Sequence, residues 1–219
     1  MIKLAIGMLF VLMNFSIDIG DLSINILPEF VGYLLFLSAS DKLKAKSAYF
    51  DKMSGWLFIM AMYKIADYIV SMLNINSGTT AAVFFFGGIV TTILGLIIQF
   101  RVFCGIDEIA YNDDVRIKSG RLFALFKVEV VLTVLAYVNN ITGIYYNYTK
   151  WGKVVPGLTR PIFRLLSGFS ADVISILDGV SVAVILIGVV VKFFMILNTF
   201  EACTDYDKIT TERSGKNNA

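Results

Sequence analysis

The chain of 219 residues contains no histidine and few charged residues. Without histidine it cannot use Ser-His-Asp or Cys-His catalysis, histidine-ligated zinc or haem, or a histidine pH switch. Charged residues make up 16% of the chain, whereas a soluble domain contains about 25%. The two cysteines, Cys104 and Cys203, are too few for a disulfide framework and are not spaced as a metal site. We therefore expect two reduced thiols.

Hydrophobic residues are abundant instead, at 57% of the chain with a mean hydropathy of +0.75. A soluble protein of 24.3 kDa has too much surface for its volume to bury that much apolar material. The sequence therefore predicts an integral membrane protein, with the lipid bilayer as its first partner. A net charge of +2 does not indicate a nucleic-acid partner. The apolar start runs into Asn14 and Asp18 without a small-residue cleavage site, so we expect no cleaved signal peptide.

Six apolar stretches are long enough to be candidate membrane spans, since a helix needs about 20 residues to cross the hydrocarbon core. They are continuous runs rather than alternating patterns, which predicts an all-α bundle. Pro28 and Glu29 suit the first turn of the second stretch. We expect one six-helix transmembrane domain over residues 1–200, an outer loop at 141–171 and a cytoplasmic tail at 201–219. The predicted spans cover about residues 3–17, 27–44, 55–74, 80–104, 120–140 and 172–198.

The orientation follows from the positions of lysine and arginine. They gather after the second, fourth and sixth spans and are absent from the loops after the first and third, so both termini are predicted to be cytoplasmic. The outer loop is an exception, because it is rich in lysine and arginine although it is predicted to lie outside the cell. It either rests on lipid headgroups or forms a vestibule that attracts an anionic ligand. Its candidate anion-attracting residues are Lys150, Lys153, Arg160 and Arg164.

Five ionisable residues are predicted to lie inside the membrane, where each costs ~2.5–3.5 kcal/mol. Lys64 and Asp67 share a helix face and can pair there. Lys64 can also meet Glu129 at the midplane if the third and fifth spans pack together, and Asp178 then faces Lys127 or a polar cavity. These charges either fix the packing register or form a polar site for a cation, a proton or a zwitterionic solute. The candidates are Lys64, Asp67, Lys127, Glu129 and Asp178.

Parts of the chain align with one another. The third and fifth spans align at an offset of 65 residues, and the fourth and sixth at 91, as expected for a duplicated helical hairpin. We find no phosphate-binding glycine loop and no G-x-S-x-G frame. The sequence therefore predicts no enzymatic activity, no metal and no cofactor; an intramembrane enzyme that uses Asp67, Glu129 or Asp178 with a bound metal is the least favoured alternative.

The stretch "GMLFVLMNFSIDIGDLSINILPEFVGYLLF" (residues 7–36) resembles the start of uncharacterised small multi-pass membrane proteins of low-GC Gram-positive bacteria. Those proteins share its short first helix, its I-L-P turn and its "FVGYLL"-type second helix. The resemblance covers about 30 residues, implies a bacterial cytoplasmic membrane and brings no known activity.

Two functions remain open. The first is a small-solute or ion transporter or channel with a central polar site. The second is a non-transporting membrane subunit or scaffold that docks a membrane or cytoplasmic protein through its inner extensions, at about residues 41–52, 107–116 and 201–213. A cavity that touches two of the named acids would favour the first function.

Overall fold

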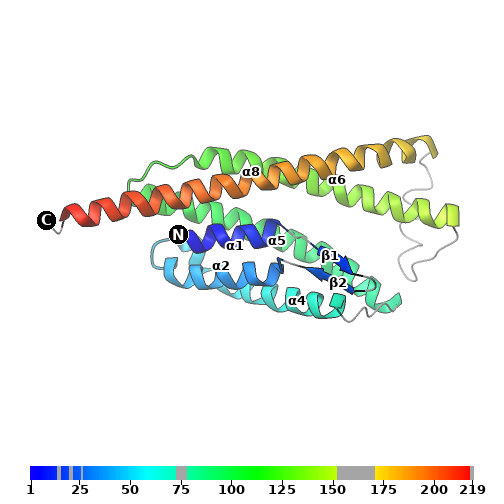
Figure 1. Cartoon of the computed structure of the whole chain (residues 1–219), viewed down its shortest axis with the longest axis horizontal. Coiled ribbons are helices and arrows are strands. Elements are labelled where there is room, and N and C mark those ends of the chain that lie inside the picture. Colours follow the sequence, from blue (N-terminus) through cyan, green and yellow to red (C-terminus); the bar gives the residue numbers. More distant parts are fainter. Residues whose placement is uncertain (14–15, 20–21, 26, 73–77, 152–170, 218–219) are drawn as a thin grey trace.

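The computed structural model describes residues 1–13, 16–19, 22–25, 27–72, 78–151 and 171–217. This part of the chain is helical apart from one short two-stranded hairpin (Figure 1), which confirms the helical class. Its elements are α1 (Ile2–Leu12), β1 (Ser16–Ile19), β2 (Leu22–Asn25), α2 (Glu29–Leu43), α3 (Ala48–Asp51), α4 (Ser54–Met72), α5 (Gly78–Asn112), α6 (Ser119–Trp151) and α8 (Ala171–Asn217).

Two helices in the described part are long and apolar enough to cross a membrane. These segments are Gly87–Asn112 of α5 and Ala183–Arg213 of α8, with mean hydropathies of 2.0 and 2.3. Helix α1 is apolar but shorter. Large hydrophobic side chains also face outward on four helices, which is unusual for a water-soluble surface. These residues form the apolar belt: Trp56, Phe58, Ile59, Met62, Ile69, Val90, Ile93, Ile97, Phe100, Val128, Val131, Val134, Leu135, Val138, Ile185, Leu186, Ile187, Val189, Val190, Phe193, Phe194 and Leu197.

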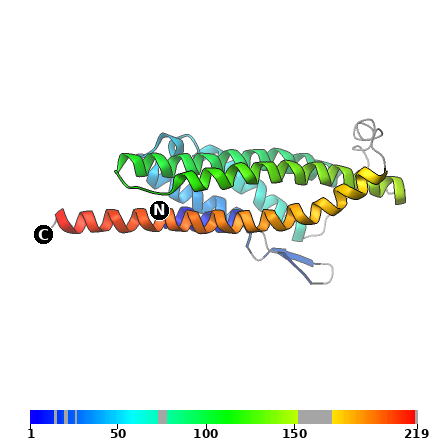
Figure 2. The ribbon, with the colours of Figure 1, turned by 90° about the horizontal axis from the view of Figure 1, so that it is seen from above.

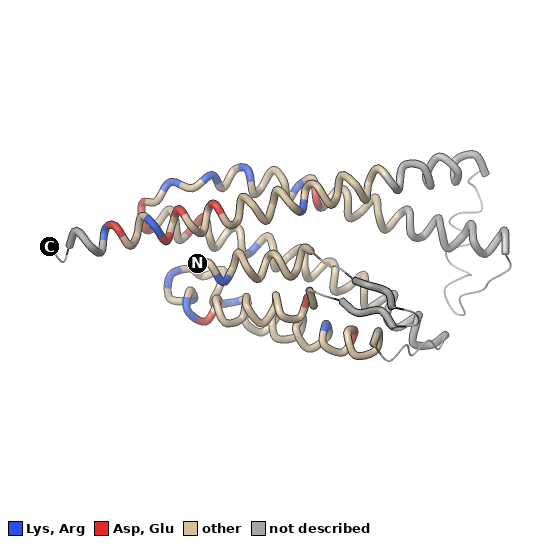
Figure 3. The backbone as a smooth tube through the Cα atoms, in the orientation of Figure 1, with Lys and Arg blue, Asp and Glu red and all other residues tan. Residues whose placement is uncertain are grey.

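The long helices run roughly along one axis, and the N-terminus lies at the same end as the C-terminal part of α8 (Figures 1 and 2). Helix α1 packs between α2 and α8, and α2 packs against α4. Helix α5 contacts α3, α4 and α6, while α6 packs mainly against α8. Most described charges gather at the end that carries the N-terminus, called here the inner end (Figure 3).

Helices α1 and α2 approach each other through two glycines. A Cβ atom on Gly32 would lie 2.7 Å from the carbonyl oxygen of Gly7, and one on Gly7 would lie 2.7 Å from the Phe36 ring. Small residues at such positions let helix backbones come close. Phe36 itself is fully buried, so this contact fixes the α1–α2 pair at the centre of the core.

The structure differs from the predictions at the end of the first span and at the start of the outer loop. Helix α1 ends at Leu12 rather than at residue 17, and β1 pairs with β2 in an antiparallel register that places Ile17 opposite Ile24. Alternating apolar residues favour strands over a helix in this segment. The outer loop does not begin at residue 141, because α6 continues to Trp151.

The predicted tail is also helical, because α8 continues to Asn217. One face of this extension is buried against the rest of the chain through Ala202, Cys203 and Tyr206. That burial explains why a segment with so many charged residues continues the helix rather than forming a loose tail.

Candidate functional site

An ion pair inside the bundle joins α2 to α4. Lys64 Nζ lies 2.7 Å from Glu29 Oε2, and the two side chains are 20% and 19% exposed. Lys64 thus pairs with Glu29 rather than with Asp67, its predicted partner. Asp67 lies within electrostatic range of both Lys64 and Glu29. From the sequence, Glu29 is expected only to stabilise the start of α2. Its contact with α4 depends on how the two helices pack.

Tyr33 follows Glu29 by one helical turn and lies between this ion pair and Glu129 on α6. Its side chain is buried and lies within electrostatic range of both Glu29 and Glu129. Gly95 of α5 makes room for the Tyr33 hydroxyl, since a Cβ atom on Gly95 would lie 3.2 Å from that oxygen.

The same face of α5 receives two more tyrosine hydroxyls. The Tyr137 hydroxyl lies 2.7 Å from Thr92 Oγ1 and donates a hydrogen bond to the carbonyl of Gly88. A Cβ atom on Gly87 would lie 2.5 Å from the Tyr63 hydroxyl. Small residues at these positions of α5 are typical of a face that packs closely on neighbouring helices. In the structure they also accommodate polar groups that converge from α2, α4 and α6.

Glu129 is the most deeply buried carboxylate described, with 5% of its surface exposed. Its Oε2 atom has no hydrogen-bond partner among the described residues, and the same is true of Oε1 of Gln99, which is equally buried. Both atoms are acceptors. Leaving a buried acceptor unpaired costs ~1–3 kcal/mol, so this part of the bundle favours a bound proton or cation.

The side chains of Gln99, Glu129 and Lys192 lie at about the same height along the bundle, as the alignment of their helices shows. The contacts Thr92–Tyr137 and Phe100–Phe126 bracket Gln99 and Glu129 in the antiparallel α5–α6 pair. The Lys118–Glu201 ion pair shows which residues of the α6 and α8 segments lie side by side. This alignment places Lys192 level with Glu129, and Lys192 is the cation that acts electrostatically on this carboxylate.

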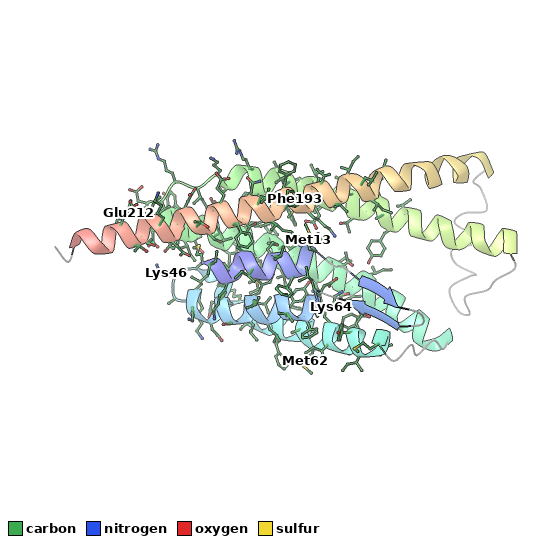
Figure 4. The ribbon with its side chains drawn as sticks, in the orientation of Figure 1. Met13, Lys46, Met62, Lys64, Phe193 and Glu212 are labelled. Atoms are coloured by element: carbon green, nitrogen blue, oxygen red, sulfur yellow. The ribbon has the colours of Figure 1, made fainter. Side chains whose placement is uncertain are left out.

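These groups form what we call the polar layer. It crosses the bundle from α4 through α2 to α6 and α8, and Lys64 marks its α4 side in Figure 4. Its ionisable carboxylates outnumber its lysines by three to two, so the layer has room for one further positive charge. Among the described residues, no group of three or more His, Cys, Asp or Glu side chains is arranged to hold a metal ion. The members of the polar layer are Glu29, Tyr33, Lys64, Asp67, Gln99, Glu129 and Lys192.

The other predicted site residues fall outside this layer. Lys127 is exposed on α6. Lys64 and Glu129 do not form the expected direct pair, because α4 packs on α2 and α5 whereas α6 packs on α5 and α8. The side chains of Asp178 and Lys150, although on helices, lie outside the described part, as do Lys153, Arg160 and Arg164 entirely.

The inner end carries a separate network, which we call the inner clasp. Lys46 Nζ donates to the Tyr206 hydroxyl at 2.9 Å and to Asp113 Oδ2 at 3.1 Å, and Tyr206 donates to the same carboxylate oxygen. The hydrogen bond from Tyr206, and then that from Lys46, lower the pKa of Asp113 below its usual value. Arg213 donates to the Asp113 carbonyl, and the N-terminal amine lies 3.0 Å from Asp207 Oδ1.

Two cavities open near the inner end. One of about 760 Å³ lies between α3, α5 and α6, and one of about 600 Å³ lies beside it around Tyr49 and Tyr111. Neither of them is lined by Lys64, Asp67 or Glu129. Both cavities are therefore separate from the polar layer, and neither is the cavity touching two of the named acids that would favour a transporter.

Comparisons with protein-family models, with curated proteins and with solved structures find no match to this chain. The functional argument therefore depends on the geometry of the chain itself.

Proposed function

We propose that the chain is an integral protein of a bacterial cytoplasmic membrane that transports a small solute or an ion. It crosses the membrane six times, with both termini cytoplasmic, and binds a proton or a monovalent cation in the polar layer. The observation that carries this proposal is Glu129, a buried carboxylate with an oxygen that lacks a hydrogen-bond partner among the described residues.

The membrane location is supported by the apolar belt and by the position of the charges. The belt covers α4, α5, α6 and α8, and most described lysines and arginines lie towards the inner end (Figure 3), as the positive-inside rule expects of a cytoplasmic end. An exposed apolar surface of this size is unfavourable in water, and the acyl chains of a bilayer can cover it. The resemblance of residues 7–36 supports a bacterial membrane.

The transport function is supported by the polar side chains that lie in the bundle near Glu129. Tyrosine hydroxyls at Gly87, Gly88 and Gly95 follow one face of α5 towards the level of Gln99. Hydroxyls both donate and accept hydrogen bonds, so each of these groups can solvate a small cation or exchange a proton with water. Intramembrane carboxylates of this kind mark proton and ion routes in other pumps and transporters.

A flux assay tests this function. Purified protein is reconstituted into liposomes that contain the pH dye pyranine, and a potassium gradient with valinomycin drives proton entry. We expect entry above that of empty liposomes, and about a tenfold or greater loss in Glu129→Gln, the size of effect expected when a general acid–base group is removed. Lys127→Gln is the matched control, since Lys127 lies two residues away but is exposed.

Parallel assays with sodium and potassium gradients extend the test to cations. The transport proposal fails if protons, sodium and potassium all enter at the rate of empty liposomes. It also fails if Glu129→Gln carries the same flux as the wild type.

A second candidate is a membrane subunit that docks a protein partner at its inner end. One observation favours it: the two cavities are lined in part by the inner segments at residues 48–52 and 107–117. Tyr111 is 85% exposed there. A photo-crosslinker in place of Tyr111 should then form one discrete adduct in cells. The same crosslinker in place of Val131, in the apolar belt, should not form it.

A further inference from the structure

The larger cavity is an amphipathic groove, called here the inner groove. Its apolar wall consists of Ile93, Ile97 and Phe100 on α5, with Phe126 and Val130 on α6. The three α5 side chains are 54%, 46% and 44% exposed, so the wall is open to the surroundings of the bundle. Its volume of about 760 Å³ is in the range of small-molecule sites.

The inner part of the groove is polar and carries both signs of charge. Lys52 follows α3, and Arg101 and Glu108 lie two turns apart on the same face of α5. Neither Lys52 nor Arg101 forms an ion pair with any other described residue, and the Oε2 atom of Glu108 is buried without a hydrogen-bond partner among them. With respect to the described residues, the groove therefore offers an anion two cations that have no ion pair, and it offers a cation one carboxylate with an unpartnered oxygen.

The dimensions match one leaflet of a bilayer. From Arg101 to Ile93 the helix rises ~12 Å, and half of the hydrocarbon core is ~15 Å thick. If the chain spans the membrane as proposed above, the apolar wall faces the acyl chains of the inner leaflet, and Lys52, Arg101 and Glu108 lie at the level of its headgroups.

We propose that the inner groove binds a phospholipid with a primary amine in its headgroup, of the phosphatidylethanolamine class. The phosphate lies between Lys52 and Arg101, the ammonium group donates to Glu108, and the acyl chains cover Ile93, Ile97 and Phe100. Arginine holds phosphate through its fork of N–H donors, and a carboxylate accepts charge-assisted hydrogen bonds from an ammonium group.

Other phospholipids fit the charges less well. Phosphatidylglycerol can use Lys52 and Arg101 but leaves Glu108 without a cation. Phosphatidylcholine has a quaternary ammonium group that cannot donate a hydrogen bond. A soluble phosphate compound would use the cations and leave the apolar wall unused. Glu108, which lines the groove and has an oxygen without a hydrogen-bond partner among the described residues, is what selects the primary amine.

Lipid binding to the purified full chain tests this proposal. The protein is prepared in lipid nanodiscs and in detergent, and its affinity is measured by native mass spectrometry for three lipids with identical acyl chains. The lipids are phosphatidylethanolamine, phosphatidylcholine and phosphatidylglycerol. The variants are Glu108→Gln and Arg101→Gln, with Glu212→Gln and Arg121→Gln as matched controls on exposed positions outside the groove. Figure 4 shows Glu212 near the C-terminal end of α8.

The wild type should bind phosphatidylethanolamine about tenfold more tightly than the other two lipids, which corresponds to one charge-assisted contact. Glu108→Gln should remove this preference, and Arg101→Gln should weaken all three lipids by about the same factor. The two controls should bind as the wild type does.

Equal affinity of the wild type for all three lipids would overturn the proposal, as would a preference that survives in Glu108→Gln. Failure of the membrane proposal is seen separately, because the chain would then not enter nanodiscs. If it enters them and transports protons without selecting phosphatidylethanolamine, only the lipid site is refuted.

Discussion

The inner clasp and the polar layer use charge in opposite ways. At the inner end, exposed charges form overlapping contacts, so that Asp113 has both Lys46 and Tyr206 as partners. Inside the bundle the charges are few, and Glu129 has a carboxylate oxygen without a described partner. A clasp built from several weak, water-screened contacts tolerates the loss of any one of them. In the layer a single unpaired group is costly, which indicates a purpose other than stability.

The largest loss of stability should come from breaking the ion pair in the polar layer. Lys64→Met removes the ammonium group 2.7 Å from Glu29 and leaves that carboxylate in a poorly solvated place. We expect the free energy of unfolding in mixed micelles to fall by about 2–3 kcal/mol. Lys127→Met, at an exposed lysine, should leave it nearly unchanged. If both variants lost the same free energy of unfolding, the Lys64–Glu29 ion pair would matter no more than an exposed lysine.

The contact between α1 and α2 should be the next most sensitive. In Gly32→Ala the new methyl group meets the Gly7 carbonyl, a backbone atom that cannot move aside alone. The two helices must separate, and we expect unfolding to become easier by about 1–3 kcal/mol. Gly55→Ala is the control because nothing lies within 4 Å of its added Cβ atom. Thermal unfolding should place the midpoint of Gly32→Ala below those of the wild type and Gly55→Ala, and a wild-type midpoint for Gly32→Ala would refute the close approach.

The inner clasp should respond to pH in a defined direction. Hydrogen bonds from Tyr206 and Lys46 lower the pKa of Asp113 in the folded chain. Its contribution to stability is therefore present above the unfolded pKa, near 4, and is lost as the pH falls through the lower folded value. Between about pH 5 and about pH 3 the melting temperature of the wild type should fall more than that of Asp113→Asn. Parallel curves for the two proteins would contradict this coupling.

The smallest effect should come from the ion pair between Lys118 and Glu201. Its atoms are 2.6 Å apart, but both side chains are well exposed, so water and salt screen their attraction. Glu201→Gln should give the same melting temperature as the wild type in scanning calorimetry. A clear loss would mean that this exposed ion pair contributes more to stability than screening by water and salt allows.

The starts of the helices with long apolar runs could be predicted to within two residues, whereas three of their ends could not. The third predicted span, residues 55–74, corresponds to α4 at Ser54–Met72, because one continuous apolar run determines it. The alternation of Ile17, Ile19, Leu22 and Ile24 indicates the hairpin. The prediction misses it because the apolar run before it is extended to residue 17 as one helix. The six-span count, the orientation and the duplicated hairpin stay predictions.

The partners within the site could not be predicted. Lys64 and Glu129 stand out in sequence as charges in apolar runs, whereas Glu29 lies at a helix start where an acid is ordinary. Only the packing of α2 against α4 makes it the partner of Lys64. Gln99 and Tyr33 carry no formal charge, so only their burial beside Glu129 gives them importance.

The most direct test of the central claim is whether Glu129 takes up a proton inside the membrane. Infrared difference spectra between alkaline and acidic buffer, recorded in nanodiscs, detect the C=O stretch of a newly protonated, buried carboxylic acid. We expect this band in the wild type and in Lys127→Gln, at a frequency typical of an apolar environment, and its loss in Glu129→Gln. A band that persists unchanged in Glu129→Gln would contradict the account.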